Sequence, residues 1–554
     1  MSLYQEQNFD ATQKEFIIDY LDNLWRDAMM QKSSSVFFNI QAEEFESQLP
    51  QYIKNFKEEG GILEARCSKE YQIPYYPFLK FIEEYLADYS ELEVEQYIEA
   101  ANIYELHKPL FVDFFNSKQI QRNEEIIIEE IKYEQQQMLK SIINLLLQLV
   151  EKEGPMLIVV KELEQAKSST LKLIQHLIQN DYQSQLMFLF SFDKRYRVLM
   201  SGMRKKAWDN FIKTIEKENM IINLNQQQEL KQTLKQNQQS EFDIDKLMEA
   251  GNNCLHLLAL DEAKRYLQRV YNYYQEQTVE LNEDRYINLL TKLGDIYNYL
   301  GDNNKALLNY QAIADYLKKQ NKTEELATAY RKSALIHFKK YNLETAEKLI
   351  DKSLKLAQDK GTEQQLFLTY FMICLIQERK KEYSAQQWEN LYNQTVPLGK
   401  KLEMYNTLAC FYTHFHYIYY IEVVEENNQQ AMENLQELVE DDSTQADNQE
   451  KLMEDTYYKE VLKIAQKYNN QYRLAAAYQL KAVIYGGKGE QEQVLKYYKK
   501  SEAIKEKLGI KRELSYIYNG LGHHYFTCEN YKQSYDYHNQ ALECLREVKD
   551  YHEI

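Results

Sequence analysis

The chain has 554 residues, with 44% hydrophobic side chains, 27% charged side chains and a net charge of −18 at pH 7. Its length calls for more than one hydrophobic core, and its composition is that of a folded protein rather than a disordered one. The negative charge argues against general affinity for nucleic-acid phosphates or anionic membrane surfaces. The longest apolar run, near residues 142–150, is too short for membrane insertion.

The six cysteines form no CxxC pair and lie within apolar helical patterns. Free cysteines of this kind are typical of a reducing compartment. The N-terminus is polar and acidic and carries no signal-peptide pattern. We therefore expect a cytoplasmic protein.

The first 34 residues carry apolar side chains at helical spacing, which predicts an N-terminal helical segment over 1–34. Short apolar runs typical of buried parallel strands follow at 36–40, 62–67, 156–160 and 186–192. A loop is predicted at 41–47, and helices are predicted at 48–59 and 168–179. This alternation of strands and helices predicts a parallel α/β sheet within residues 35–240.

Two stretches of this region carry a resemblance to a known family. The first is GILEARCSKEYQIPYYPFLKFIEEYL, and the second, PMLIVVKELEQAKSSTLKLIQHLI, follows a long predicted helix. Their order and spacing resemble the nucleotide-binding module of STAND/AAA-type ATPases. In that family the module is fused to tetratricopeptide repeats, in bacterial regulators and in the C-terminal region of soluble adenylate cyclases. The resemblance implies a P-loop NTPase-like fold for residues 35–240.

The implied nucleotide site departs from what its chemistry requires. A phosphate loop needs glycine backbone N–H groups, a lysine and a hydroxyl for Mg²⁺, whereas residues 39–47 contain three glutamates and neither glycine nor lysine. The metal-binding acidic pair of the family is replaced by Lys161 and Glu162. We interpret the module as a degenerate pseudo-NTPase that hydrolyses no nucleotide and holds no cofactor. Its vestigial nucleotide site comprises Asn39, Glu43, Glu44, Ser47, Lys161, Glu162 and Arg197.

The second half of the chain is repetitive. Gly294 and Ala334 are 40 residues apart, as are Ala482 and Gly522. A small residue at such positions lets two helices approach closely, and the pattern resembles tetratricopeptide repeats with long helices. Clear units are predicted near 243–277, 284–318, 325–358, 472–507 and 512–546, and weaker units near 362–395 and 403–440.

We thus predict a mainly α-helical protein in which a TPR-like α-solenoid of about seven hairpins, 241–554, follows the degenerate α/β domain. An acidic loop is predicted at 440–450. The expected helix-packing residues are Gly251, Ala263, Gly294, Ala306, Ala334, Ala346, Ala482, Gly522 and Ala541.

Histidine pairs at His414 and His416 and at His523 and His524 are the only hint of a metal site. Such neighbours diverge on a helix, so we interpret them as packing residues and predict no metal. The sequence also lacks the common hydrolase, metalloprotease and kinase motifs. No catalytic residue is predicted.

These patterns favour a non-catalytic scaffold or adaptor subunit of a larger assembly, which binds other proteins through its solenoid and binds no nucleic acid. Two alternatives remain open. One is a nucleotide-responsive signalling regulator that binds ATP by another route, and the other is the regulatory part of a cyclase-like enzyme. The resemblance to soluble cyclases extends the expected cytoplasmic location to the cytoskeleton or cilium.

Overall fold

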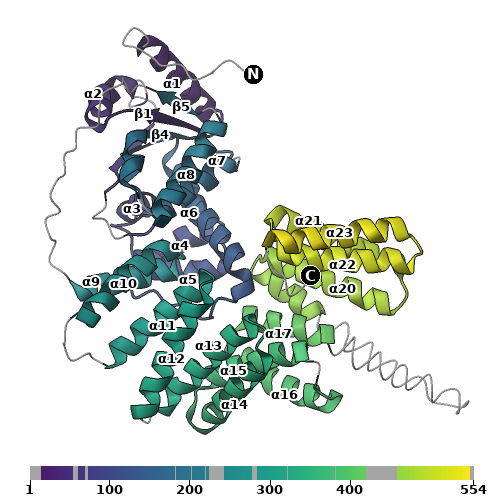
Figure 1. Cartoon of the computed structure of the whole chain (residues 1–554). Coiled ribbons are helices and arrows are strands. Elements are labelled where there is room, and N and C mark those ends of the chain that lie inside the picture. The colour runs from purple at the N-terminus through teal and green to yellow at the C-terminus, as the bar shows by residue number, and fades with distance from the viewer. Residues whose placement is uncertain are drawn as a thin grey trace, which may run out of the picture. The chain divides into compact units, whose positions relative to one another are not determined.

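The computed structural model describes residues 14–53, 56, 60–68, 73–180, 182–200, 202–218, 220–223, 243–276, 283–320, 322–380, 382–418 and 458–548. The chain forms two compact units (Figure 1). The first comprises Met1–Arg122 with Glu134–Leu300, and the second comprises Asn123–Tyr133 with Gly301–Ile554. The predicted loop 440–450 lies outside the described residues.

The first unit contains a five-stranded parallel sheet in the order β2-β3-β4-β1-β5. Its strands are β1 (Ser34–Asn39), β2 (Gly61–Arg66), β3 (Met156–Lys161), β4 (Leu186–Phe192) and β5 (Ile221–Asn223). The four predicted apolar runs correspond to β1 to β4. All seven residues of β4 are buried, which explains why this strand reads as a continuous apolar run.

Alternate side chains of the strands enter two different apolar layers. Phe38 and Leu189 pack with α1 (Lys14–Met29) and α2 (Ala42–Tyr52) on one face. On the other face Phe37 stacks on Phe190 at 4.7 Å between ring centroids and meets Phe211 of α8 (Gly202–Lys217) edge-on. Helices therefore cover both faces of the sheet, as a parallel sheet requires.

The remaining helices of the first unit are α3 (Phe78–Tyr85), α4 (Glu91–Ala100), α5 (Lys108–Phe115), α6 (Ile131–Glu153), α7 (Ser168–Gln179), α9 (Ile244–His256), α10 (Leu260–Glu276) and α11 (Glu283–Tyr299). The first three residues of α6 belong to the second unit. Short 3-10 turns lie at Glu105–His107, Leu163–Gln165 and Lys194–Leu199.

One prediction near β1 is wrong. Residues 41–47 were expected to form a loop before a helix at 48–59, but α2 already begins at Ala42 and ends at Tyr52. The sequence Ala-Glu-Glu-Phe-Glu favours helix, and Glu43 and Glu44 lie in the first turn, where negative charge stabilises a helix. Only Ile40 and Gln41 separate the strand from the helix.

Helices α9 to α11 belong to the first unit, although they follow the predicted domain boundary at residue 240. Contacts with the α/β layer explain this. The Tyr75 hydroxyl donates to the Leu257 carbonyl at 2.9 Å, and the Glu262 carboxylate accepts from the Ser169 N–H at 3.0 Å. The boundary itself falls on residues 224–242, outside the described residues.

The second unit is a series of helical hairpins. Its helices are α12 (Asn303–Gln320), α13 (Thr323–Lys339), α14 (Leu343–Lys360), α15 (Glu363–Lys380), α16 (Ala385–Lys401), α17 (Tyr405–Ile418), α20 (Gln471–Gly487), α21 (Gln491–Leu508), α22 (Lys511–Thr527) and α23 (Tyr531–Val548), with a further helical stretch at 458–467. The units predicted near 325–358, 472–507 and 512–546 coincide with the pairs α13–α14, α20–α21 and α22–α23.

All nine predicted packing residues lie on helices and are buried. Gly251 of α9 shows why the position must be small. A Cβ atom there would lie 2.5 Å from Cδ2 of Leu267 on α10. No helix in the described part of the chain is both long and apolar enough to cross a membrane.

Candidate functional site

The carboxyl end of the parallel sheet is the first candidate site. The connection after β1 leads toward the β2 edge, whereas the connection after β4 leads toward β5, so β1 and β4 flank a topological switch point. Ligands of open α/β sheets bind at such points. Here Asn39, at the end of β1, accepts the Lys194 N–H at 3.1 Å and donates to the Asn223 side chain at 2.9 Å. Asn39 therefore ties β1 to its neighbours.

The cations at this edge are paired with glutamates. Lys161 of β3 lies 3.0 Å from a Glu64 carboxylate oxygen and 3.7 Å from Glu46. Arg66 of β2 pairs with Glu46 and, at 3.3 Å, with Glu162. Because carboxylates already hold both cations, neither offers its charge freely to a phosphate.

The start of α2 carries negative charge where a phosphate would bind. Helix N-termini attract anions, but Glu43 and Glu44 occupy the first turn of α2. The Ser47 hydroxyl donates to the Glu44 carbonyl at 2.8 Å, on its own helix. These residues form a negative, internally bonded edge.

Residues that follow β3 and β4 also form hydrogen bonds and ion pairs with neighbouring residues. Glu162 adopts a left-handed backbone conformation, with φ of 58°, and donates its N–H to the Ser191 hydroxyl at 3.2 Å. Arg197 forms two contacts with Asp209 of α8, at 2.5 and 2.9 Å, and is half-exposed. Arg195 pairs with Asp193 at 2.6 Å.

The buried Glu164, which sequence analysis did not single out, lies beside this edge. Its carboxylate accepts the Asp193 N–H at 3.1 Å. Desolvation by burial, helped by the nearby Glu162 and Asp193 charges and opposed by backbone hydrogen bonds, raises the pKa of Glu164 to about 8. Glu164 therefore tends to hold a proton at neutral pH.

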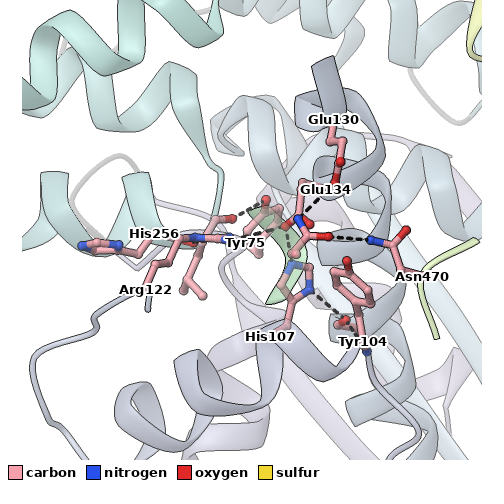
Figure 2. A network of polar contacts seen from close by, with 11 residues as sticks. Tyr75, Tyr104, His107, Arg122, Glu130, Glu134, His256 and Asn470 are labelled. Atoms are coloured by element: carbon pink, nitrogen blue, oxygen red, sulfur yellow. Dashed lines mark hydrogen bonds and ion pairs between the residues drawn. The ribbon is translucent and has the colours of Figure 1, made fainter. Parts of the chain in front are cut away.

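A second buried polar group lies in the first unit, around His107 (Figure 2). Glu134 lies 3.2 Å from His107 Nε2 and 3.4 Å from Arg122, and the Arg122 guanidinium donates to the His256 carbonyl at 3.0 and 3.1 Å. His107 is fully buried, and desolvation lowers its pKa. The network links the 3-10 turn Glu105–His107, Arg122, α6 and the last residue of α9, so its role is structural.

The third candidate site is a surface of the second unit that holds residues 123–133. We call these residues the acidic segment. The Glu124 carboxylate accepts the N–H groups of Asn406 and Thr407, at 3.1 and 2.8 Å, and so caps α17 from outside that helix. Glu125 binds both terminal nitrogens of Arg331 on α13, at 2.9 and 2.8 Å. Burial opposes ionisation, but Arg331 and Lys332 lower the pKa of Glu125 to about 2.

The end of the acidic segment reaches α20. Glu130 is 1% exposed and forms an ion pair with Arg473, which is 2% exposed. Asn406 also donates to Glu130, at 3.3 Å, and Tyr133 accepts the Gln471 N–H at 3.0 Å. Figure 2 also labels Glu130 and Asn470, and the Asn470 side chain donates to Asn406 Oδ1 at 3.2 Å. Helices α13, α17 and α20 thus all bind this one stretch of chain, which includes a 3-10 turn at Ile128–Glu130 and the first three residues of α6.

In the described part of the chain, no three His, Cys, Asp or Glu side chains lie close enough together to hold a metal ion. His414 contacts Glu378 at 2.7 Å, and His524 contacts Gln491 at 2.9 Å. Both histidines serve contacts between helices.

No protein-family model and no curated protein matches the chain. Solved structures similar to it include apo RapI, at 12% identity and TM-score 0.43, with 55% of this chain and 99% of that chain covered. A STAND protein with a tetratricopeptide repeat sensor from Pyrococcus horikoshii has 12% identity and TM-score 0.33, with coverages of 96% and 84%. The apo quorum sensor NprR from B. thuringiensis has 14% identity and TM-score 0.40, with coverages of 75% and 99%. Because these scores establish no common fold, the description of each unit rests on its own contacts.

Proposed function

We propose that this chain is a non-catalytic adaptor that binds partner proteins through its helical repeats. The observation that carries the proposal is the binding of the acidic segment by the second unit. Backbone N–H groups at the starts of α17 and α20, together with Arg331 and Arg473, hold this short piece of polypeptide. Solenoids bind segments of other proteins with the same chemical groups.

In this proposal the α/β layer is a scaffold without nucleotide hydrolysis. The two-residue connection between β1 and α2 leaves no room for a phosphate loop. The pairing of Lys161 and Arg66 with glutamates supports the same conclusion. Turnover of ATP with Mg²⁺ by the purified full chain would contradict this part of the proposal.

Exposed aromatic side chains on the last hairpin offer a contact surface. Phe526, Tyr531 and Tyr535 are 59%, 61% and 69% exposed, and the first two rings lie 5.7 Å apart. Aromatic residues are enriched in interfaces, and gathered exposed apolar groups mark them. We assign this surface, residues 526, 531 and 535, to partner binding.

The test is purification of the tagged full chain from its own cells, followed by native mass measurement and identification of stoichiometric companions. We expect a complex of fixed composition. The double variant Phe526→Ser, Tyr535→Ser should lose companions, whereas Leu308→Ser, which changes a 65% exposed side chain on α12, should keep them. A lone wild-type chain would overturn the adaptor proposal, and equal retention by both variants would overturn the assigned surface.

A further inference from the structure

A cavity of about 450 Å³ lies within the first unit, where the start of α7 and Arg204 of α8 face α10. Five basic side chains line it, whereas only two lining side chains are acidic. The basic residues are Lys167, Arg204, Lys264, Arg265 and Arg269, and the acidic residues are Asp261 and Glu262. In a chain with a net charge of −18, this is a local concentration of positive charge.

Neutral oxygens position the cations that flank the cavity. The Lys167 ammonium donates to the Tyr266 hydroxyl at 2.6 Å, and Arg265 donates to the same hydroxyl at 3.4 Å. Arg204 donates to the backbone carbonyl of Glu164. Hydrogen bonds of this kind orient a cation and leave its charge in place.

The two acidic lining residues also bind groups outside this basic set, and the charge of Glu262 raises the pKa of Lys167 within it. Glu262 accepts the Ser169 N–H in the first turn of α7, and Asp261 lies 3.2 Å from Lys172. Their charge is therefore partly balanced by the helix N-terminus and by another lysine. Basic side chains outnumber acidic ones in the lining by five to two.

Crowding of like charges is visible in the proton affinities. Desolvation, together with the nearby Arg265, lowers the pKa of Lys167 to about 8, although Cys254 and Glu262 act in the opposite direction. Desolvation and Arg265 also lower the pKa of Arg204. An anion between these groups would relieve the repulsion and raise the pKa of Lys167.

We propose that this cavity binds a small molecule that carries two or more phosphate groups. Its volume is within the range of small-ligand sites, about 300–1,000 Å³. Planar guanidinium groups match phosphate oxygens in pairs, and three arginines line the cavity. Its lining includes neither Lys161 nor Arg66, the cations at the carboxyl end of the sheet, and the proposed binding needs no Mg²⁺.

The experiment is calorimetric titration of the full chain at about 0.15 M salt without Mg²⁺, with inorganic tripolyphosphate and ATP as separate probes. We expect binding of both, weakened at least about tenfold by Arg265→Gln, because a charged donor is lost. Lys206→Gln is the matched control, since it removes the same charge from α8 outside the cavity lining and should leave affinity unchanged. Affinity should fall from pH 7 to pH 9 as Lys167 loses its proton.

The two probes distinguish the source of the phosphate groups. Equal affinity indicates that the phosphate chain alone is recognised, and tighter binding of ATP indicates a nucleotide ligand. Absence of heat with both probes at about 1 mM would overturn the proposal. A requirement for Mg²⁺ would also overturn the proposal. An equal loss of affinity in Arg265→Gln and Lys206→Gln would overturn it as well. None of these outcomes depends on partner proteins, so the adaptor proposal stands or falls separately.

Discussion

Ion pairs of glutamates differ in their contribution to stability between two regions, the carboxyl end of the sheet and the surface that holds the acidic segment. At the sheet, Glu46 and Glu162 pair with Arg66, whose side chain is 51% exposed, and such pairs contribute little to stability. On the repeats, Glu130 and Arg473 are almost completely buried together. The difference shows that burial and the partner, rather than the residue type, decide what a carboxylate does.

The strongest test of this comparison is Arg473→Met. It leaves Glu130 buried without its cation, so we expect a loss of about 3–5 kcal/mol in the free energy of unfolding. Urea unfolding measures the loss, and hydrogen exchange should show reduced protection of residues 123–133. The double variant Arg473→Met, Glu130→Leu should recover most of the stability. Arg285→Gln, which breaks an exposed pair with Asp245, is the control, and its change should be small. If Arg473→Met lowered the free energy of unfolding as little as Arg285→Gln does, the stabilising role of the buried pair would be refuted.

A second test concerns the buried acid beside the sheet. The pKa of Glu164 is about 8 in the folded chain and about 4.5 when unfolded, so the folded state binds more protons between these pH values. Stability therefore falls as pH rises through this window. Glu164→Gln removes the ionisable group and should stabilise the protein by about 4 kcal/mol at pH 8, with little effect below pH 4.5. Thermal unfolding at both pH values measures this, and a pH-independent effect would contradict the assignment.

The smallest expected effect is that of Glu125→Gln. The pKa of Glu125 is lowered to about 2, so its contribution is present above pH 4.5 and is lost as pH falls toward 2. Because its side chain is 39% exposed, solvent screens the pair with Arg331, and we expect a loss of only about 1 kcal/mol at pH 7. Urea unfolding of wild type and variant from pH 7 to pH 3 should show the difference shrinking. If the difference in the free energy of unfolding between wild type and variant stayed constant with pH, the charge of Glu125 would not be its source.

Local patterns in the sequence predicted the periodic elements well. The run at 186–192 is β4, and the unit predicted at 284–318 corresponds to α11 and α12. The prediction failed at residues 41–47, where the resemblance to a phosphate loop outweighed the helix propensity of Ala42 and the glutamates. The acidic segment was missed because nothing local marks it, although its glutamates could have prompted a search for buried cations.

The sequence by itself determined the first four strands and the helices of the clear repeats, since hydrophobic spacing and small residues such as Gly251 act over a few turns. It also determined that residues 39–47 lack the groups that hold a phosphate. Only the tertiary structure decided which charges meet. Glu125 and Arg331 are 206 residues apart, and the basic residues of the cavity come from segments before α7, in α8 and in α10. Pairing over such distances depends on how helices pack, which no local pattern encodes.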